Sequence, residues 1–580
     1  MLRFLSALVI AGLIGTQTPV PQPATVIRVT TRLVQVSLVA HDKKGQPVAD
    51  LKKEDFTLYD KGQEQKISMF SMDTRAASAA AEPAKPLPEG FVSNRVWTAM
   101  GPESHAEALP GSVTVILLDG LNSEFHDMPA TKAGLTKFLQ QIQPNDRVAI
   151  YALGQKLQVL HDFTSDTAAL IQTIDRYKAG FPWQLDASHA TDPNTGLPQQ
   201  DAFEIIFENA VNNFYKGQRI EITLAALETI GNHLSGIKGR KNVIWLSGGF
   251  PTVLGINDAA LIALVSQTPS VGQTQVSPTP GIGQNLEVRV YAEQLLRTLR
   301  ALSKASVALY PVDSRGMPGP MQLMPGFMTN AGRTNLGNTP LASPGPSRAD
   351  STAQNDIVES HSTMQEIAAR TGGRAFMNSG DIAGAIRSAI ADTDVSYTLV
   401  YSPSHKEWNG EFREIKVKVN RPDVEIRYRQ GYYALPQDPS DEQSRKVALS
   451  AAASSPLLST GLGITGNVVP PGPEADRTSA KINLLLDVKD VDFSPDEMNA
   501  WIADVDVLVV VRDSQNKTLS SALHTFHLSL EQDRYDFSQK AGFTIPMKVE
   551  TPPKSALVRV VVRDIPTGVL GSLDVPLPVQ

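Results

Sequence analysis

Long apolar runs alternate with helical patterns through the middle of the chain. These runs are 113–119, 146–153, 241–246 and 306–313. Because they lack regular polar alternation, they predict strands that are buried on both faces, as in parallel sheets covered by helices. Apolar residues recur at helical spacing between the runs, for example over 129–142 and 219–235. The alternation of strands and helices predicts a doubly wound, Rossmann-like α/β domain over residues 111–394.

The segments on both sides of this domain show the two-residue alternation of β structure. Residues 24–74 and 395–435 each predict a few short strands, too few to be stable alone. We therefore expect the two sets to pair into one β-sandwich, with the α/β domain inserted between its halves. Residues 448–580 predict a second, C-terminal β-sandwich. The Ala-, Pro- and Ser-rich segment 75–110 and the acidic segment 436–447 are expected to be linkers.

The first residues of the chain have the pattern of a secretory signal peptide. A short cationic start, Met1–Arg3, precedes an apolar run over residues 4–15, which is shorter than the ~20 residues a membrane-spanning helix needs. The alternative is a buried N-terminal strand or helix. We expect residues 1–20 to be a signal peptide and the protein to be exported, to the periplasm, the medium or the cell surface.

Composition removes several classes of function. The chain has no cysteine, which excludes disulfides, thiolate zinc sites and cysteine nucleophiles. A formal net charge of -7 over 580 residues argues against nucleic-acid partners. No later segment is long and apolar enough to predict a transmembrane helix.

Two of the predicted buried strands end in an aspartate, Asp119 and Asp313. Ligands of doubly wound folds bind at the carboxyl ends of the strands, so Asp119 is a candidate site residue. For Asp313, an ion pair with Arg315 is the simpler expectation. Ser247 lies between a buried strand and two glycines, an arrangement similar to a hydrolase nucleophile, but no histidine can be assigned to it from the sequence.

Several motifs together resemble the von Willebrand factor type A domain, and in particular the exported bacterial proteins related to it. The matching segments are Gly45–Leu51, Leu117–Ser123, Asn242–Phe250, Tyr310–Gly316 and Arg429–Tyr433. They span roughly residues 25–435 and leave the C-terminal region outside the resemblance. The resemblance implies a Rossmann-like fold that binds partners at the carboxyl edge of its sheet.

The resemblance also implies a magnesium site, the metal-ion-dependent adhesion site, which this sequence retains only in part. Asp119 and Ser123 match the first aspartate and the last serine of the family's ligand loop, and Thr223 is the nearest candidate for its distant threonine. Leu121 replaces the middle serine, and Gly248 lies where the family has a second aspartate. With so few oxygen ligands we expect a degenerate site, with loss of Mg²⁺ favoured over its retention.

The expected function is adhesion or protein binding without catalysis. The partner would be a protein or an extracellular or envelope component, contacted through the loop residues Asn122, Glu124 and Asp127 and through Ser247. Glu124 or Asp127 is also placed to compensate for the lost metal ligands. Two alternatives remain open, namely a hydrolase that uses Ser247 and a structural envelope subunit whose C-terminal sandwich donates or accepts a strand.

Overall fold

The computed structural model describes most of the chain after residue 32. The described ranges are 33–74, 87–98, 106–108, 113–143, 146–178, 202–250, 294–316, 348–434, 441–469 and 478–577. The expected signal peptide therefore lies outside the described residues. Within these ranges, the structure contains no helix with the length and apolar character needed to cross a bilayer.

A five-stranded sheet forms the centre of the α/β domain, in the order β10-β9-β8-β11-β12. Its strands are β8 (Val113–Asp119), β9 (Val148–Leu153), β10 (Leu157–Thr164), β11 (Lys241–Ser247) and β12 (Val307–Asp313). All neighbours run parallel except β10, which pairs antiparallel with β9. The chain adds β9 on one side of β8 and β11 on the other, so the strand order reverses at β8. Doubly wound folds bind ligands at such a reversal point.

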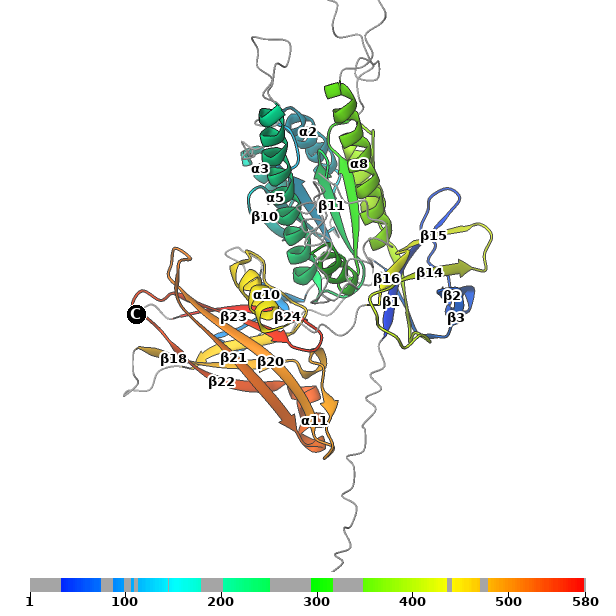
Figure 1. Ribbon diagram of the computed structural model, residues 1–580. Coiled ribbons are helices and arrows are strands. Elements are labelled where there is room, and N and C mark those ends of the chain that lie inside the picture. The colour runs from blue at the N-terminus through cyan, green and yellow to red at the C-terminus, as the bar shows by residue number, and fades with distance from the viewer. Residues whose placement is uncertain are drawn as a thin grey trace, which may run out of the picture. The chain divides into compact units, whose positions relative to one another are not determined.

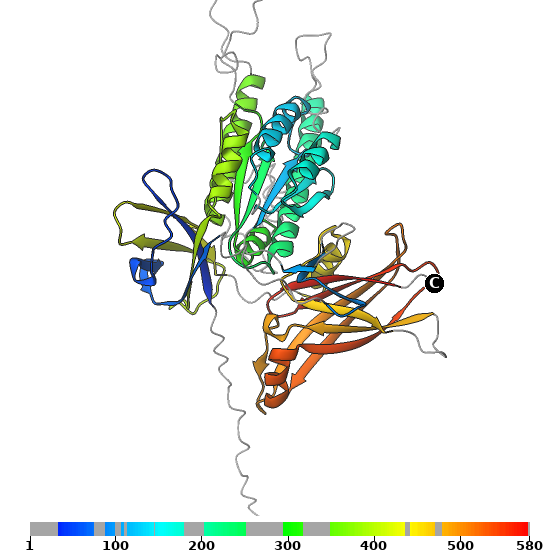
Figure 2. The ribbon, with the colours of Figure 1, turned by 180° about the vertical axis from the view of Figure 1, so that it is seen from behind.

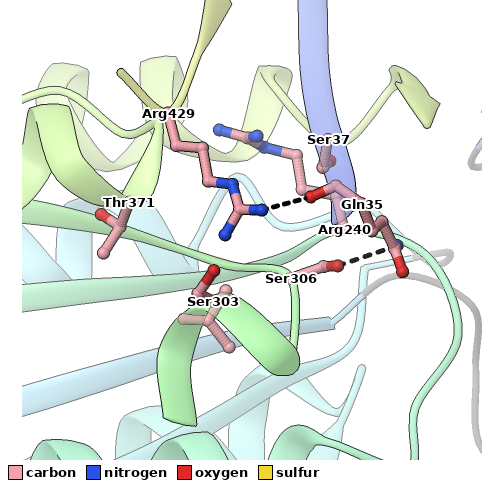
Figure 3. Close-up of a pocket in the computed structure, with 8 residues that line it drawn as sticks. Gln35, Ser37, Arg240, Ser303, Ser306, Thr371 and Arg429 are labelled. Atoms are coloured by element: carbon pink, nitrogen blue, oxygen red, sulfur yellow. Dashed lines mark hydrogen bonds between the residues drawn. The ribbon is translucent and has the colours of Figure 1, made fainter. Parts of the chain in front are cut away.

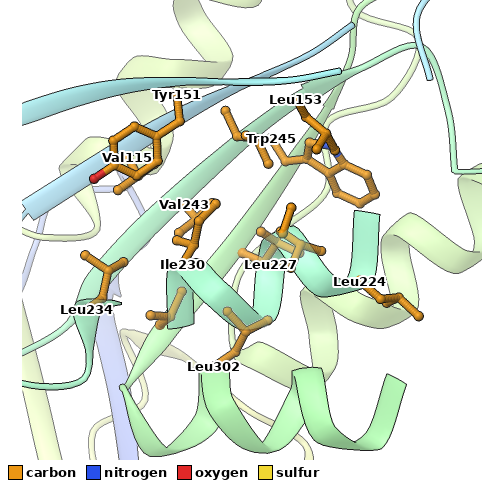
Figure 4. Packing of buried hydrophobic residues seen from close by; sticks show 14 of the residues in the cluster. Val115, Tyr151, Leu153, Leu224, Leu227, Ile230, Leu234, Val243, Trp245 and Leu302 are labelled. Carbon is orange, nitrogen blue, oxygen red and sulfur yellow. The ribbon is translucent and has the colours of Figure 1, made fainter. Parts of the chain in front are cut away.

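Helices cover both faces of this sheet (Figure 1; Figure 2). They are α2 (Met128–Leu139), α3 (Thr167–Arg176), α5 (Ala202–Leu234), α8 (Arg348–Thr371), α9 (Ile382–Ala391) and the helical residues 294–304. Alternate residues of β8 belong to different cores. Val115 and Leu117 pack with α5, α8 and residues 294–304, as Figure 4 shows in part, whereas Ile116 and Leu118 pack with α2, α3 and α9. A strand buried on both faces must be apolar throughout, which explains the run that ends at Asp119.

The first β region combines strands from both sides of the α/β domain. They are β1 (Val34–Asp42), β2 (Phe56–Asp60), β3 (Gln63–Gln65), β4 (Ile67–Thr74), β13 (Val395–Tyr401), β14 (Phe412–Val419), β15 (Val424–Tyr428) and β16 (Gly431–Tyr433). One sheet has the order β15-β1-β13-β4 and the other β16-β14-β2-β3. Side chains from both sheets form one hydrophobic core. β1 and β4 flank β13, so the entry to and the exit from the α/β domain lie on neighbouring strands.

The C-terminal β region also has two sheets around one core. Its strands are β17 (Ile464–Val469), β18 (Ser479–Leu486), β19 (Ser494–Pro495), β20 (Trp501–Arg512), β21 (Thr518–Leu530), β22 (Phe543–Glu550), β23 (Leu557–Asp564) and β24 (Leu570–Pro576). The sheets have the orders β22-β18-β17-β5, in which β5 is Phe91–Ser93, and β19-β20-β23-β24, and β21 pairs with β20. The described chain thus consists of one α/β domain and two β regions.

Three elements differ from the sequence-based expectation. The sequence pattern predicts two helices, over 201–215 and 219–235, but the structure has a single helix, α5. Gly217, between the two predicted helices, does not end α5, because a glycine inside a helix costs only about 1 kcal/mol. Within the expected linker 75–110, β5 (Phe91–Ser93) pairs with β17. Within the expected linker 436–447, α10 (Glu442–Ser454) begins after Asp441, whose side chain caps the helix, and Leu449 anchors it on the sheet.

Candidate functional site

The candidate site lies where β8 ends, and Asp119 is its centre. The Asp119 side chain is 1% exposed. Its Oδ1 accepts hydrogen bonds from the backbone N–H groups of Leu121 (3.1 Å) and Asn122 (3.0 Å). Its Oδ2 accepts hydrogen bonds from Asn122 Nδ2 (2.9 Å), Trp245 Nε1 (2.9 Å) and Ser247 Oγ (2.8 Å). Both carboxylate oxygens are therefore fully engaged by donors from the loop and from β11.

The position of these donors follows from the sheet register. Parallel pairing places Ser247 of β11 opposite Asp119 of β8 and Trp245 opposite Leu117. Successive side chains of a strand alternate between faces, so Trp245 and Ser247 point to the same side. The Trp245 indole is fully buried and has a single donor, which finds its acceptor in the Asp119 carboxylate. Trp245 is a site residue that the sequence analysis missed.

Thr223 and Ser123 belong to the same network. Asn122 Nδ2 donates to Thr223 Oγ1 (2.9 Å), and the Thr223 hydroxyl donates to the backbone oxygen of Arg219, one helical turn earlier in α5 (2.7 Å). Ser123 Oγ accepts from the backbone N–H of Gly248 (2.8 Å). The structure thus brings together all three residues to which the family resemblance assigned metal ligation, and each already has hydrogen-bond partners.

Burial and hydrogen bonding act in opposite directions on the pKa of Asp119. Burial raises the pKa of the Asp119 carboxyl, and the hydrogen bonds from Asn122, Ser247 and Trp245 act in the opposite direction. A buried carboxylate needs either a countercharge or several donors to remain ionised. In this chain the donors are neutral N–H and O–H groups, so protein dipoles stabilise the negative charge.

These residues do not fit a bound Mg²⁺ ion. Mg²⁺ requires oxygen ligands in an octahedral arrangement, whereas Trp245 and the amide nitrogen of Asn122 present N–H donors to Asp119. Leu121 is buried and offers no ligand atom. No group of three or more acidic or histidine side chains suited to a metal ion occurs within the described ranges.

The other expected binding residues differ in exposure. Glu124 is exposed, and its carboxylate lies 3.2 Å from His126 Nδ1. Asp127 is 4% exposed, and burial raises the pKa of its carboxyl. No donor within the described ranges reaches Asp127 Oδ2. A Cβ atom at Gly248 would lie 2.8 Å from the backbone oxygen of Asn122, so only glycine lets β11 approach the loop this closely.

Ser247 has no histidine among its described hydrogen-bond partners. Its hydroxyl contacts Asp119 Oδ2 and the backbone of Gly249. His361, on α8, is instead bound to Asp313, with 2.6 Å between Nε2 and Oδ2. Arg315 pairs with the same carboxylate through Nε at 2.9 Å. Arg315 was expected from the sequence, whereas His361 could not be, because only tertiary packing places α8 beside the end of β12.

A polar cavity separate from this site has a volume of about 20 Å³ (Figure 3). Arg429 Nη2 donates to the backbone oxygen of Gln35 at 2.7 Å, and Gln35 Nε2 donates to Ser306 Oγ at 3.0 Å. Ser37 Oγ and Arg240 Nε also line the cavity region and find no partner within the described ranges. The volume suits a single water molecule rather than a substrate.

Comparison with known proteins gives a resemblance in structure only. No protein-family model and no curated protein matches the chain. Among solved structures, an aerotolerance-related membrane protein from Bacteroides fragilis is 15% identical, with 48% of this chain and 98% of that chain covered and a TM-score of 0.22. A von Willebrand factor type A protein from Catenulispora acidiphila is 10% identical, with 88% and 74% covered and a TM-score of 0.21.

A third similar structure is the vWF domain of the type V pili tip protein Mfa5 from Porphyromonas gingivalis. It is 12% identical, with 35% of this chain and 81% of that chain covered and a TM-score of 0.20. Proteins with a von Willebrand factor type A domain are therefore among the structures found, and this is the family that the sequence motifs resemble. At these identities and TM-scores, the α/β fold is assigned from the strand order and connections of this chain itself.

Proposed function

We propose that this chain is an exported, non-catalytic binding protein of the von Willebrand factor type A kind. Its α/β domain would bind a protein, or a matrix or envelope component, through the loops at the carboxyl edge of its parallel sheet. Two β-sandwich modules, formed by the two β regions, would carry this domain. The metal-ion-dependent adhesion site would be degenerate, so that binding proceeds without Mg²⁺.

One observation carries the proposal, namely the saturation of the Asp119 carboxylate by neutral donors. In a metal-dependent site, this carboxylate would face a cation whose open position accepts an acid from the partner. Here its lone pairs point at N–H and O–H groups that belong to the fold. The end of β8 would therefore support the loop rigidly instead of coordinating a metal ion. The surrounding loop would contact the partner.

The loop after β8 supports this role. Glu124 and His126 are exposed beside the buried network, at the reversal point where doubly wound folds bind ligands. Polar side chains held on a rigid scaffold are typical of binding surfaces. The signal-peptide pattern of residues 1–20 supports export.

A hydrolase that uses Ser247 receives less support. A serine nucleophile needs a base that takes its proton, and the described partners of Ser247 Oγ are an already saturated carboxylate and the backbone of Gly249. His361 is hydrogen-bonded to Asp313 instead. We therefore place these residues in the structural framework of the binding face.

The test is a binding assay between the purified full chain and a solubilised envelope fraction, run with EDTA and again with Mg²⁺. We expect equal binding in both buffers and no binding heat when Mg²⁺ is titrated into the protein. Glu124→Arg should weaken binding, whereas Glu550→Arg, the same change at an exposed position of the C-terminal β region, should not. Binding that requires Mg²⁺, or equal effects of both variants, would overturn the proposal.

A further inference from the structure

One edge of the C-terminal β region is open along a long strand. β21 (Thr518–Leu530) pairs with β20 without interruption from Trp501↔Leu530 to Val511↔Ser520. No other described strand pairs with β21, so among the residues that the structure describes nothing pairs with the backbone N–H and C=O groups of its second edge. Such a row of groups is a template for one kind of ligand, an additional β-strand.

Solvent reaches the middle of β21 from both faces. The five consecutive residues 521–525 are all exposed, although successive side chains of a strand point to opposite faces. Leu523 is 38% exposed. Within the described ranges, therefore, neither the second sheet nor α10 covers this part of the strand, and a partner strand could approach it without displacing other elements.

The composition of β21 lacks the usual protection of an edge strand. Natural edges carry Lys, Pro, inward charges or short strands that prevent pairing with other chains. The thirteen residues of β21, TLSSALHTFHLSL, contain no Lys, Arg, Asp, Glu or Pro, and their ionisable side chains are His524 and His527. The edge strand β22 (Phe543–Glu550) of the second sheet differs, since it exposes Pro546, Lys548 and Glu550. The sequence of β22 thus disfavours pairing with another chain, whereas the sequence of β21 permits it.

We propose that β21 pairs antiparallel with β21 of a second copy of this chain, which joins the two sheets into one across a twofold axis. An identical strand can pair with β21 in this way because it brings no like charges into the contact. The twofold arrangement is self-complementary and closes at two copies, so it forms a dimer rather than a fibre.

Charges on the neighbouring strand do not oppose this contact. Asp504 of β20 lies 2.7 Å from His527 Nδ1. Asp506 accepts hydrogen bonds from Thr525 Oγ1 at 2.6 Å and from Arg445 Nε at 2.8 Å. Each acid therefore has a hydrogen-bond partner within its own protomer.

The test is sedimentation equilibrium of the purified full chain over a wide concentration range. We expect a monomer–dimer equilibrium, with hydrogen exchange in residues 518–530 slowing as the dimer forms. Leu523→Lys should raise the dissociation constant by at least about tenfold, because it places two ammonium groups near the axis. The matched control is Thr544→Lys on the exposed face of β22, which should leave the constant unchanged.

Thermal unfolding of both variants verifies that they fold, since each position is exposed. A chain that remains monomeric at every concentration would overturn the inference. So would a dimer that Leu523→Lys and Thr544→Lys affect equally, because a different surface would then hold it together. This inference is independent of the proposed function, which concerns the α/β domain, and each can fail without the other.

Discussion

The substitution Asp119→Asn tests whether donors or a metal ion stabilise the end of β8. The change preserves the shape of the side chain but replaces one acceptor oxygen with an N–H₂ group. If this group occupies the position of Oδ2, Trp245 Nε1 and Asn122 Nδ2 face a donor instead of an acceptor, while Ser247 can still donate to the backbone oxygen of Gly249. Each buried donor left without an acceptor costs about 1–3 kcal/mol.

The net loss is smaller than the sum of these costs, because the variant no longer buries a charge. We expect a loss of about 3 kcal/mol in the free energy of unfolding of the α/β domain. For a domain of this size, that corresponds to a fall of about 6–12 °C in its melting temperature. Differential scanning calorimetry of the full chain, in EDTA and in Mg²⁺, measures this shift, which should be the same in both buffers.

A matched control separates this effect from a general effect of the chemical change. Asp166→Asn is the same substitution in the same domain, at the N-cap of α3 where the side chain accepts from Ala168 and Ala169 N–H groups. Asparagine caps helices as well as aspartate does, so this variant should melt close to the wild type. The reasoning is refuted if Asp119→Asn melts at or above the wild type in EDTA, since an emptied metal site gains stability when a carboxylate is removed.

Two further predictions concern Lys241 and Gly248. Burial lowers the pKa of Lys241 to about 7, whereas in the unfolded chain it is about 10.4. Between these two pH values the unfolded chain binds more protons than the folded chain, so the free energy of unfolding rises with pH. Lys241→Met should therefore stabilise the protein by about 2–4 kcal/mol near pH 6, and this gain should vanish near pH 10. Denaturant unfolding curves at the two pH values measure the gain, and a gain that does not change with pH would contradict the prediction. Gly248→Ala places a Cβ atom 2.8 Å from the backbone oxygen of Asn122. Calorimetry should show a loss of about 1–3 kcal/mol in the free energy of unfolding. An unchanged melting temperature would show that the loop moves aside without cost.

The sequence was sufficient to predict the α/β domain because its strands are buried on both faces. The apolar run before Asp119 has no other stable environment in a water-soluble domain. The pairing of segments 24–74 and 395–435 could also be predicted, because neither has enough strands to form a core alone.

Other features depend on contacts that local patterns do not encode. Trp245 reaches Asp119 only because β11 and β8 pair in one particular register, and a parallel sheet of apolar strands gives no local sign of its register. His361 meets Asp313 across the packing of α8. β5 has three residues, too short a segment for alternation to be recognised. Asp119, Asn122 and Ser247 could therefore be named from the sequence, whereas the hydrogen bond from Trp245 to Asp119 could not.

The insertion of the α/β domain into the first β region has a consequence for synthesis. Val36 pairs with Leu399 and Leu58 with Val417, so β1 to β4 leave the ribosome long before their partners exist. The nascent chain must keep these strands apart from other molecules until the whole intervening domain has been translated. A product truncated anywhere before β13 would lack the strand between β1 and β4 and expose both of their edges, so premature termination should yield aggregates rather than a usable fragment.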